Sequence, residues 1–318
     1  MAMVDVQNLT RRFKHLEAVR GVSFEVVEGE VFGFLGPNGA GKTTTIDMLC
    51  TLLRPTSGTA SINGFDVVRR RDDVRRSIGL VFQQPTLDET LTAEQNLRFH
   101  AYAYGLPGAD RQRRIRELLT MVELWDRRDD SVRTFSGGMR RRLEIARGLL
   151  HHPDVLFLDE PTLGLDPQTR RRIWQYLTEL RSHGDLTIFL TTHYMDEAEN
   201  CDRIAVIDHG RIVALDTPAQ LKSDVGGDLI TITTVDGEAA AGELRRSYGV
   251  APAVNGETVS FQVPAGEAFL PGVVRGFSQP LVAITVRRPT LDDVFLDLTG
   301  REIRDGDVHA SAAVGGRR

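Results

Sequence analysis

One stretch decides the fold of this chain: Gly36-Pro37-Asn38-Gly39-Ala40-Gly41-Lys42-Thr43. It consists of a glycine, four free positions, and then glycine, lysine and a hydroxyl residue. The apolar run Val31 to Leu35 precedes it and predicts a buried strand, and Thr44 to Cys50 can start a helix. A strand, a glycine-rich turn and a helix N-terminus form the kind of loop whose backbone N–H groups surround a phosphate. A chance glycine-rich turn is the alternative, and this context disfavours it.

The residues at the end of this loop have individual expected roles. Lys42 is expected to reach the β- and γ-phosphates of a nucleotide, and the Thr43 hydroxyl to ligate magnesium. Thr44 follows at the helix start, where unpaired N–H groups and the helix dipole favour an anion. The loop from Gly36 to Thr44 therefore predicts a binding site for a nucleotide with Mg²⁺.

Length and composition set outer limits on the function. The 318 residues allow one large domain with a small one, or two modest domains, and the net charge is −5. No apolar run approaches the roughly 18 residues that span a bilayer, and the first residues do not resemble a signal peptide. Cys50 and Cys201 have no metal or redox spacing, so packed thiols in a reducing cytosol are expected.

The order of apolar runs predicts two domains and a tail. Met3 to Leu9 alternates like an edge strand, and strands then alternate with helices, which predicts an α/β domain with a mostly parallel sheet over residues 1–224. Helical spacing of apolar residues predicts a helical insertion at about 88–150. Residues 225–303 read as a small α+β domain of ferredoxin-like βαββαβ type, and 304–318 as a disordered tail.

A second acidic motif completes the expected nucleotide site. The continuous apolar run Val155 to Leu158 predicts a central parallel strand, and it ends in Asp159 and Glu160. Asp159 is placed to hold magnesium through water, and Glu160 to polarise the attacking water. The alternative is that both carboxylates are solvated turn residues. The presence of the phosphate loop in the same domain makes this alternative much less favoured.

Two further polar residues follow predicted strands. His193 comes after a buried strand, and its imidazole is a candidate for a hydrogen bond to the γ-phosphate or the attacking water. Gln83 also follows a strand, and its amide could reach magnesium or that water. A purely structural role for either residue remains open.

Ser136-Gly137-Gly138 is an unusual start for a helix, because two glycines lower helix propensity. Ser136 would cap the helix and the N–H groups would face a phosphate. Since the phosphate loop already binds the nucleotide of its own subunit, this second helix end suggests the nucleotide of a second copy. The alternative is a flexible helix cap.

Together these motifs make the chain resemble the ATP-binding subunits of ABC transporters, with a P-loop NTPase domain containing a mixed sheet. The motifs occur in that family's order: Phe13, the phosphate loop, Gln83, Ser136-Gly137-Gly138-Met139, Val155 to Glu160, Leu165-Asp166 and His193. The resemblance implies that Phe13 stacks on adenine, that Gln83 couples the site to a membrane partner, and that Asp166 communicates across a dimer. It also implies that Glu160 is the general base, that His193 senses the γ-phosphate, and that Ser136 and its glycines complete the opposite subunit's site.

The signature segment departs from the family's commonest form, which has leucine first and glutamine last, since here Phe135 and Met139 occupy those places. What that glutamine side chain contributes is therefore absent. Phe135 to Leu143 and Pro289 to Gly300 resemble the daunorubicin-resistance type of drug exporter. That resemblance favours export over import and does not identify the cargo.

The sequence thus predicts the ATP-hydrolysing motor of an exporter for drugs or other hydrophobic compounds. Two copies would act with a separate transmembrane permease, peripherally at the cytoplasmic face of the cell membrane. One alternative is a soluble ABC ATPase acting on nucleic acid or ribosomes, suggested by the clusters Arg69-Arg70-Arg71 and Arg140-Arg141-Arg142. Acidic residues are interspersed, so solvated faces are favoured and no nucleic-acid partner is expected. A small-molecule kinase is another alternative, in which the signature segment would have no role.

Overall fold

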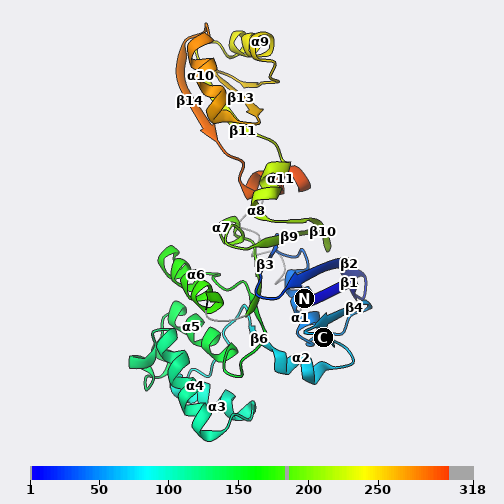
Figure 1. Cartoon of the computed structure of the whole chain (residues 1–318), viewed down its shortest axis with the longest axis vertical. Coiled ribbons are helices and arrows are strands. Elements are labelled where there is room, and N and C mark those ends of the chain that lie inside the picture. Colours follow the sequence, from blue (N-terminus) through cyan, green and yellow to red (C-terminus); the bar gives the residue numbers. More distant parts are fainter. Residues whose placement is uncertain (1, 183–185, 301–318) are drawn as a thin grey trace, which may run out of the picture. The chain divides into compact units, whose positions relative to one another are not determined.

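The computed structural model describes residues 2–182 and 186–300. The described chain forms two compact units, with the division after Leu215 (Figure 1). Helix α8 (Pro218–Asp224) packs on α11 (Leu291–Thr299), so α8 belongs to the second unit. None of the helices in these residues is long and apolar enough to cross a membrane. The tail predicted for residues 304–318 lies outside the described residues.

The first unit is built on a six-stranded sheet in the order β10-β9-β3-β8-β7-β6. Its centre consists of β3 (Val31–Leu35), β7 (Val155–Asp159) and β8 (Thr187–Thr192), in which every residue is buried. These strands pair in parallel, as do β6 with β7 and β3 with β9. Their carboxyl ends therefore meet at one edge of the sheet. The remaining strands are β6 (Ile78–Val81), β9 (Arg203–Asp208) and β10 (Arg211–Asp216).

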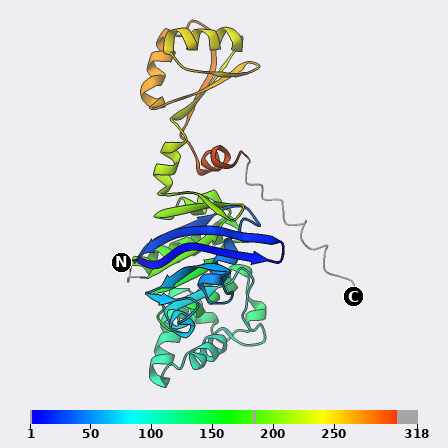
Figure 2. The ribbon, with the colours of Figure 1, turned by 90° about the vertical axis from the view of Figure 1, so that its right-hand side faces the viewer.

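A second sheet, in the order β2-β1-β4-β5, is antiparallel. Figure 2 shows β1 and β2 as the long pair of dark blue arrows. The prediction of an edge strand at Met3 to Leu9 is wrong, because β1 lies between β2 and β4, a strand that the sequence analysis did not identify. Phe24 of β2 stacks on Phe32 with ring centroids 5.5 Å apart and also contacts Phe34 and Phe189, so an aromatic cluster joins the two sheets. The strands are β1 (Ala2–Phe13), β2 (Leu16–Val27), β4 (Ser57–Ile62) and β5 (Phe65–Asp66).

Three helices follow β6 in the region where the sequence predicts a helical insertion (Figure 1). They are α3 (Ala93–Ala103), α4 (Gly108–Met121) and α5 (Gly137–Gly148). Thr92 and Gln95 form a reciprocal capping box at the start of α3, which satisfies two otherwise free N–H groups. The apolar positions at helical spacing are the core of these helices: Leu97, Ile115, Leu118 and Leu119 are all buried. The other helices of this unit are α1 (Lys42–Leu49), α2 (Arg71–Ser77), α6 (Pro167–Ser182) and α7 (Met195–Ala198).

The second unit has its own sheet, in the order β12-β13-β11-β14, with antiparallel pairing. Along the chain its elements alternate as strand, helix, two strands, helix and strand. Buried side chains such as Ile230, Ile232, Leu244 and Phe261 form its core. The elements are β11 (Asp228–Thr234), α9 (Gly237–Tyr248), β12 (Ala253–Asn255), β13 (Thr258–Val263), α10 (Gly266–Gly276) and β14 (Leu281–Arg287).

Candidate functional site

The phosphate loop joins β3 to the N-terminus of α1, in the context that the sequence predicted. Gly41 has φ 108, and a Cβ atom there would lie 2.6 Å from the Ala18 carbonyl oxygen, so only glycine fits this turn. Lys42 begins α1 and is 5% exposed. Its Nζ donates to the carbonyl oxygens of Gly36 at 2.8 Å and Pro37 at 3.2 Å. The lysine ammonium is thereby held over the loop.

The Glu160 carboxylate is the meeting point of the predicted catalytic residues. Glu160 Oε1 lies 3.2 Å from Lys42 Nζ and 3.3 Å from His193 Nδ1, which is buried without an aligned hydrogen-bond partner. Glu160 Oε2 accepts a 3.0 Å hydrogen bond from Gln83 Nε2. Residues from the loops after β3, β6, β7 and β8 therefore converge on one carboxylate.

This environment keeps Glu160 ionised. Burial by itself would raise the pKa of the carboxyl, but contact with His193 and the positive charge of Lys42 outweigh burial and hold the pKa below its usual value. For Lys42, burial dominates and lowers the pKa of the ammonium, although Glu160 opposes that shift. Lys42 and Glu160 thus form a buried ion pair in which each group favours the charged form of the other.

Asp159 and Thr43 form an oxygen-rich corner beside this carboxylate. Thr43 Oγ1 donates to Asp159 Oδ2 at 3.0 Å, and Thr191 Oγ1 donates to Asp159 Oδ1 at 2.5 Å. Burial raises the pKa of Asp159, while these two hydroxyls oppose the shift. A hydroxyl and a carboxylate suit Mg²⁺, which commonly takes only one or two protein carboxylates and fills its other positions with phosphates and water. The described residues contain no group of three or more His, Cys, Asp or Glu that could hold a metal by themselves.

Three predicted contacts lie outside the Glu160 cluster. Phe13 ends β1, is 40% exposed and has the Arg11 guanidinium 4.5 Å from its ring centroid. Asp166 accepts from the backbone N–H groups of Gln168 and Thr169, at 3.1 and 3.0 Å, so it caps the start of α6. Within this chain Asp166 thus has a structural role.

The third is the signature segment. Ser136 caps α5, because its Oγ accepts from Met139 N at 3.3 Å. A cavity of about 440 Å³ opens at Ser136 and Gly138. Its lining includes three arginines, Arg142, Arg171 and Arg172, together with Glu123, which pairs with Arg142 and Arg172. The cavity therefore combines a helix N-terminus with a net positive charge.

A second groove lies where the helical insertion borders the strand β6. This cavity of about 460 Å³ is lined by Leu52, Phe82, Thr86, His100 and Tyr104 among others. On α3, beside His100, the side chains of Phe99 and Tyr102 are 64% and 61% exposed. The lining also includes Arg75 and Arg147, so the groove combines apolar and aromatic side chains with two arginines close to the Gln83 loop.

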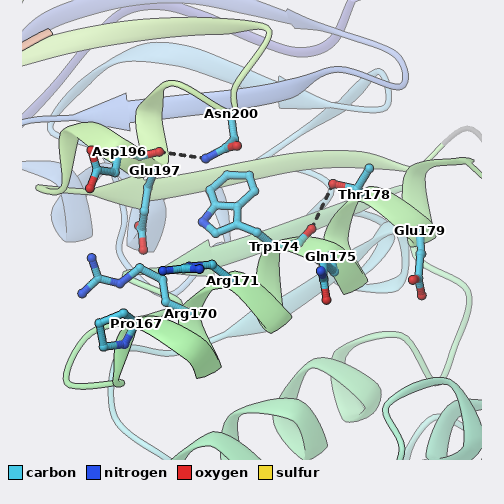
Figure 3. A pocket seen from close by; sticks show the side chains of 10 residues that line it. All are labelled: Pro167, Arg170, Arg171, Trp174, Gln175, Thr178, Glu179, Asp196, Glu197 and Asn200. Atoms are coloured by element: carbon cyan, nitrogen blue, oxygen red, sulfur yellow. Dashed lines mark hydrogen bonds between the residues drawn. The ribbon is translucent and has the colours of Figure 1, made fainter. Parts of the chain in front are cut away.

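A cavity of about 670 Å³ lies between α6 and α7 and shares the lining residues Arg171 and Gln175 with the cavity at Ser136 and Gly138 (Figure 3). The indole of Trp174 lies between Asn200 and Glu197 on one side and Arg170 and Arg171 on the other (Figure 3). No residue predicted as functional lines it. Glu197, which lines this cavity, accepts a 2.6 Å hydrogen bond at Oε2 from Thr192 Oγ1, next to His193.

Sequence reasoning missed Thr191, Arg141 and Glu144. Thr191 is the penultimate residue of β8 and supports Asp159, a role that its place near a strand end would have suggested. Arg141 was predicted to lie on a solvated face, and this prediction is wrong: it is 6% exposed and bound to the carbonyl groups after β7. A run of three arginines gives no sign of which one is buried, because burial depends on the position of a neighbouring strand.

The whole chain is similar to several known proteins. The family model for ABC transporters matches residues 19–163. A daunorubicin resistance ATP-binding protein of Streptomyces coeruleorubidus is 41% identical, over 95% of this chain and 97% of that protein. A linearmycin resistance ATP-binding protein of Bacillus subtilis is 38% identical, over 95% and 100%. A Nod factor export ATP-binding protein of Burkholderia orbicola is 41% identical, over 96% and 99%.

Solved structures give the same result for the fold. The structure of an ATP-binding subunit of an ABC transporter matches with a TM-score of 0.63 and 33% identity, over 70% of this chain and 92% of that chain. A dimeric ATP-binding cassette in a post-hydrolysis state, bound to ADP and Pi, matches with a TM-score of 0.62 and 31% identity, over 68% and 98%.

Proposed function

Because this chain belongs to the ABC transporter family and is an ATP-binding, ATP-hydrolysing protein, we propose that it is the motor of an exporter. The observation that carries the proposal is the convergence of Lys42, Gln83 and His193 on Glu160. The full-length similarity to drug-resistance and Nod factor export proteins supports export of a drug, an antibiotic or another hydrophobic compound.

In the proposed reaction the phosphate loop holds ATP and Glu160 acts as general base. Lys42 binds the β- and γ-phosphates, and the Glu160 carboxylate takes the proton of a water whose oxygen attacks the γ-phosphorus. The bond from that phosphorus to the bridging oxygen breaks, which releases ADP. Gln83 and His193 orient the base and the water, since both already contact the Glu160 carboxylate. The lowered pKa of Glu160 keeps it ready to accept a proton at neutral pH.

Thr43, Asp159 and Gln83 are the proposed residues for Mg²⁺. The short contact between Thr43 and Asp159 supports this, because both present oxygen to the same point. Bound Mg²⁺ would neutralise negative charge on the phosphates during transfer. Phe13, exposed at the end of β1, is the proposed stacking platform for adenine.

We assign the cavity at Ser136 and Gly138 to the ATP of a second copy. The N-terminus of α5 and the net positive charge of the lining suit a phosphate, although Arg142 and Arg172 also pair with Glu123. Two copies would then enclose two ATP molecules, with each nucleotide touching both chains and Asp166 near the contact between them. Hydrolysis removes the γ-phosphate that bridges the copies, so the dimer reopens.

The proposed partner is a separate transmembrane permease, which would place this protein at the cytoplasmic face of the membrane. The groove beside the Gln83 loop is the proposed docking surface, because its lining residue Phe82 directly precedes Gln83, which contacts Glu160. Movement there would be transmitted to the site.

Residues 225–303 remain a proposed ferredoxin-like domain after the ATP-binding domain that the sequence predicts for residues 1–224, although the second compact unit already begins at Asp216 and includes α8. The strand order β12-β13-β11-β14 and the alternation of strands and helices support this assignment.

Co-purification with its membrane partner, followed by transport in vesicles, tests the proposed function. Inside-out vesicles carrying both proteins should accumulate a fluorescent hydrophobic drug when ATP and Mg²⁺ are added. Vesicles with the Glu160→Gln protein are the matched control and should not. If phosphate is released but no permease co-purifies and no drug moves, the protein is an ATPase with a different output.

A further inference from the structure

Arg141 differs from its neighbours in the run Arg140-Arg141-Arg142. The side chains of Arg140 and Arg142 are 25% and 18% exposed, and Arg140 pairs with Glu89 at the surface. Arg141 is buried at the start of α5, on the side of the helix that faces the ends of β6 and β7. Its surroundings therefore need a separate explanation.

The Arg141 guanidinium binds two catalytic loops at once. Nε donates to Pro161 O at 2.6 Å, and Nη2 donates to Asp159 O at 2.9 Å and to Glu160 O at 3.0 Å. Nη1 donates to Phe82 O, the residue directly before Gln83. Four backbone carbonyl groups from two strand ends are thus collected by one planar cation.

Glu144, one turn further along α5, completes this arrangement. It is fully buried, and its Oε2 lies 3.2 Å from Arg141 Nη1. Its Oε1 accepts from the backbone N–H of Thr86 at 2.7 Å. The loop that carries Gln83 is therefore held on both sides, by Arg141 before Gln83 and by Glu144 after it.

The backbone that Arg141 holds is strained. Glu160 has φ 45, a left-handed conformation that residues other than glycine rarely adopt. Such a conformation persists only where surrounding contacts impose it. Three consecutive carbonyl groups around Glu160, those of Asp159, Glu160 and Pro161, are bound by Arg141, and Glu160 N donates to Thr191 Oγ1 at 3.0 Å.

We propose that Arg141, supported by Glu144, is a positioning residue that fixes the Glu160 turn and the Gln83 loop to the signature helix. This inference rests on the proposed function, because it assigns catalysis to Glu160. The same helix begins at Ser136 and Gly138, which face the proposed ATP of the second copy. Arg141 thereby joins the general base of one site to the helix that completes the other site.

Steady-state ATP hydrolysis by Arg141→Met, Arg141→Lys and Arg140→Met tests the inference. For Arg141→Met we expect kcat to fall on the order of 10- to 100-fold while KM changes little, because the base is misplaced and the phosphate loop is intact. The kcat of Arg141→Lys should lie between those of Arg141→Met and the wild type, since an ammonium keeps the charge but cannot bind four carbonyl groups together. Arg140→Met removes a neighbouring surface arginine and should retain wild-type kcat.

Binding of a fluorescent ATP analogue, measured on the same samples, separates positioning from folding. If Arg141 only stabilised the fold, the Arg141→Met protein would lose kcat and the number of nucleotides bound per chain in the same proportion. A kcat per bound nucleotide equal to that of the wild type would therefore overturn the inference. If Arg141→Met does not fold, Glu144→Gln decides. It keeps the side-chain shape and should also lower kcat at constant KM, and an unchanged kcat would contradict the proposal. A wild-type protein that releases no phosphate would instead refute the proposed function itself.

Discussion

At the scale of single residues, the state of the Glu160 carboxylate depends on three neighbours from distant parts of the chain. Without them, burial would favour the protonated carboxyl, which cannot accept a proton from water. Lys42 and His193 favour the ionised carboxylate, and Gln83 orients the carboxylate group through a 3.0 Å hydrogen bond. The catalytic competence of Glu160 is therefore a property of the cluster.

Replacing Glu160 with glutamine should stop turnover and leave ATP binding intact. We expect kcat to fall by about 10²- to 10⁴-fold, the usual contribution of a general base, while the affinity for ATP is retained because Lys42 and the phosphate loop are unchanged. Phosphate release and equilibrium nucleotide binding measure the two effects. Hydrolysis near the wild-type rate would show that another group is the base.

The pH dependence follows from the same cluster. Because the pKa of Glu160 is lowered in the folded protein, the carboxylate stays ionised as the pH falls through the ordinary glutamate range, and it is lost only below that range. The acid limb of kcat/KM attributable to Glu160 should therefore lie below the usual glutamate pKa. Lys42→Met should move that limb to higher pH in the residual activity, since it removes the opposing positive charge.

At the scale of elements, the packing of α5 against α6 explains one of the signature glycines. A Cβ atom on Gly138 would lie 2.4 Å from Thr169 Cγ2. Thr169 cannot simply rotate away, because its hydroxyl donates to Asp166 Oδ2 at 2.6 Å. Gly138 is thus required for packing within the chain, in addition to any contact with a nucleotide.

Gly138→Ala should therefore destabilise the protein, although alanine favours helices by up to about 1 kcal/mol over glycine. Overpacking typically costs about 1–3 kcal/mol, so we expect a net loss in the free energy of unfolding, measured with urea. Adding Thr169→Ser removes Cγ2, keeps the hydroxyl, and should restore stability.

Gly137→Ala is the matched control for this prediction. A Cβ atom there would meet Leu165 Cδ2 at 3.6 Å, an ordinary contact, so its stability should stay close to wild type. Equal losses for both alanine variants would show that the Thr169 contact is not the cause.

At the scale of the whole molecule, the phosphate loop and the signature helix belong to different halves of the proposed composite site. Lys42→Ala disables the first half and Ser136→Glu, which places negative charge at the proposed phosphate contact, disables the second. Each variant alone should be inactive. Mixing the two proteins should restore ATP hydrolysis, because a mixed dimer contains one site built from two intact halves.

A single-turnover assay at increasing protein concentration measures this recovery. Activity in the mixture should rise with concentration, as dimer formation requires. A mixture that hydrolyses no more ATP than the separate variants would show that the two motifs do not act across a dimer.

The sequence by itself indicated the phosphate loop, the acidic end of β7, the helices between β6 and β7 and the central strands of the six-stranded sheet, but it missed β4 and the interior place of β1. These features are local. The spacing of apolar residues predicts whether a segment is a helix or a strand. The glycines, Lys42, Asp159 and Glu160 indicate phosphate and metal chemistry by their residue types alone. Gln83 and His193 could be named as candidates because both follow strands whose carboxyl ends meet.

Only the tertiary structure decided which of these residues touch, and how. The interior position of β1, the burial of Arg141 and the support of Asp159 by Thr191 all depend on contacts between segments far apart in sequence. The sequence is the same whether an arginine is solvated or bound to four carbonyl groups. The role of Arg141 therefore follows from the packing of α5 on two strand ends. The phosphate loop was readable from its own residues, but the state of the carboxylate beside it required the fold.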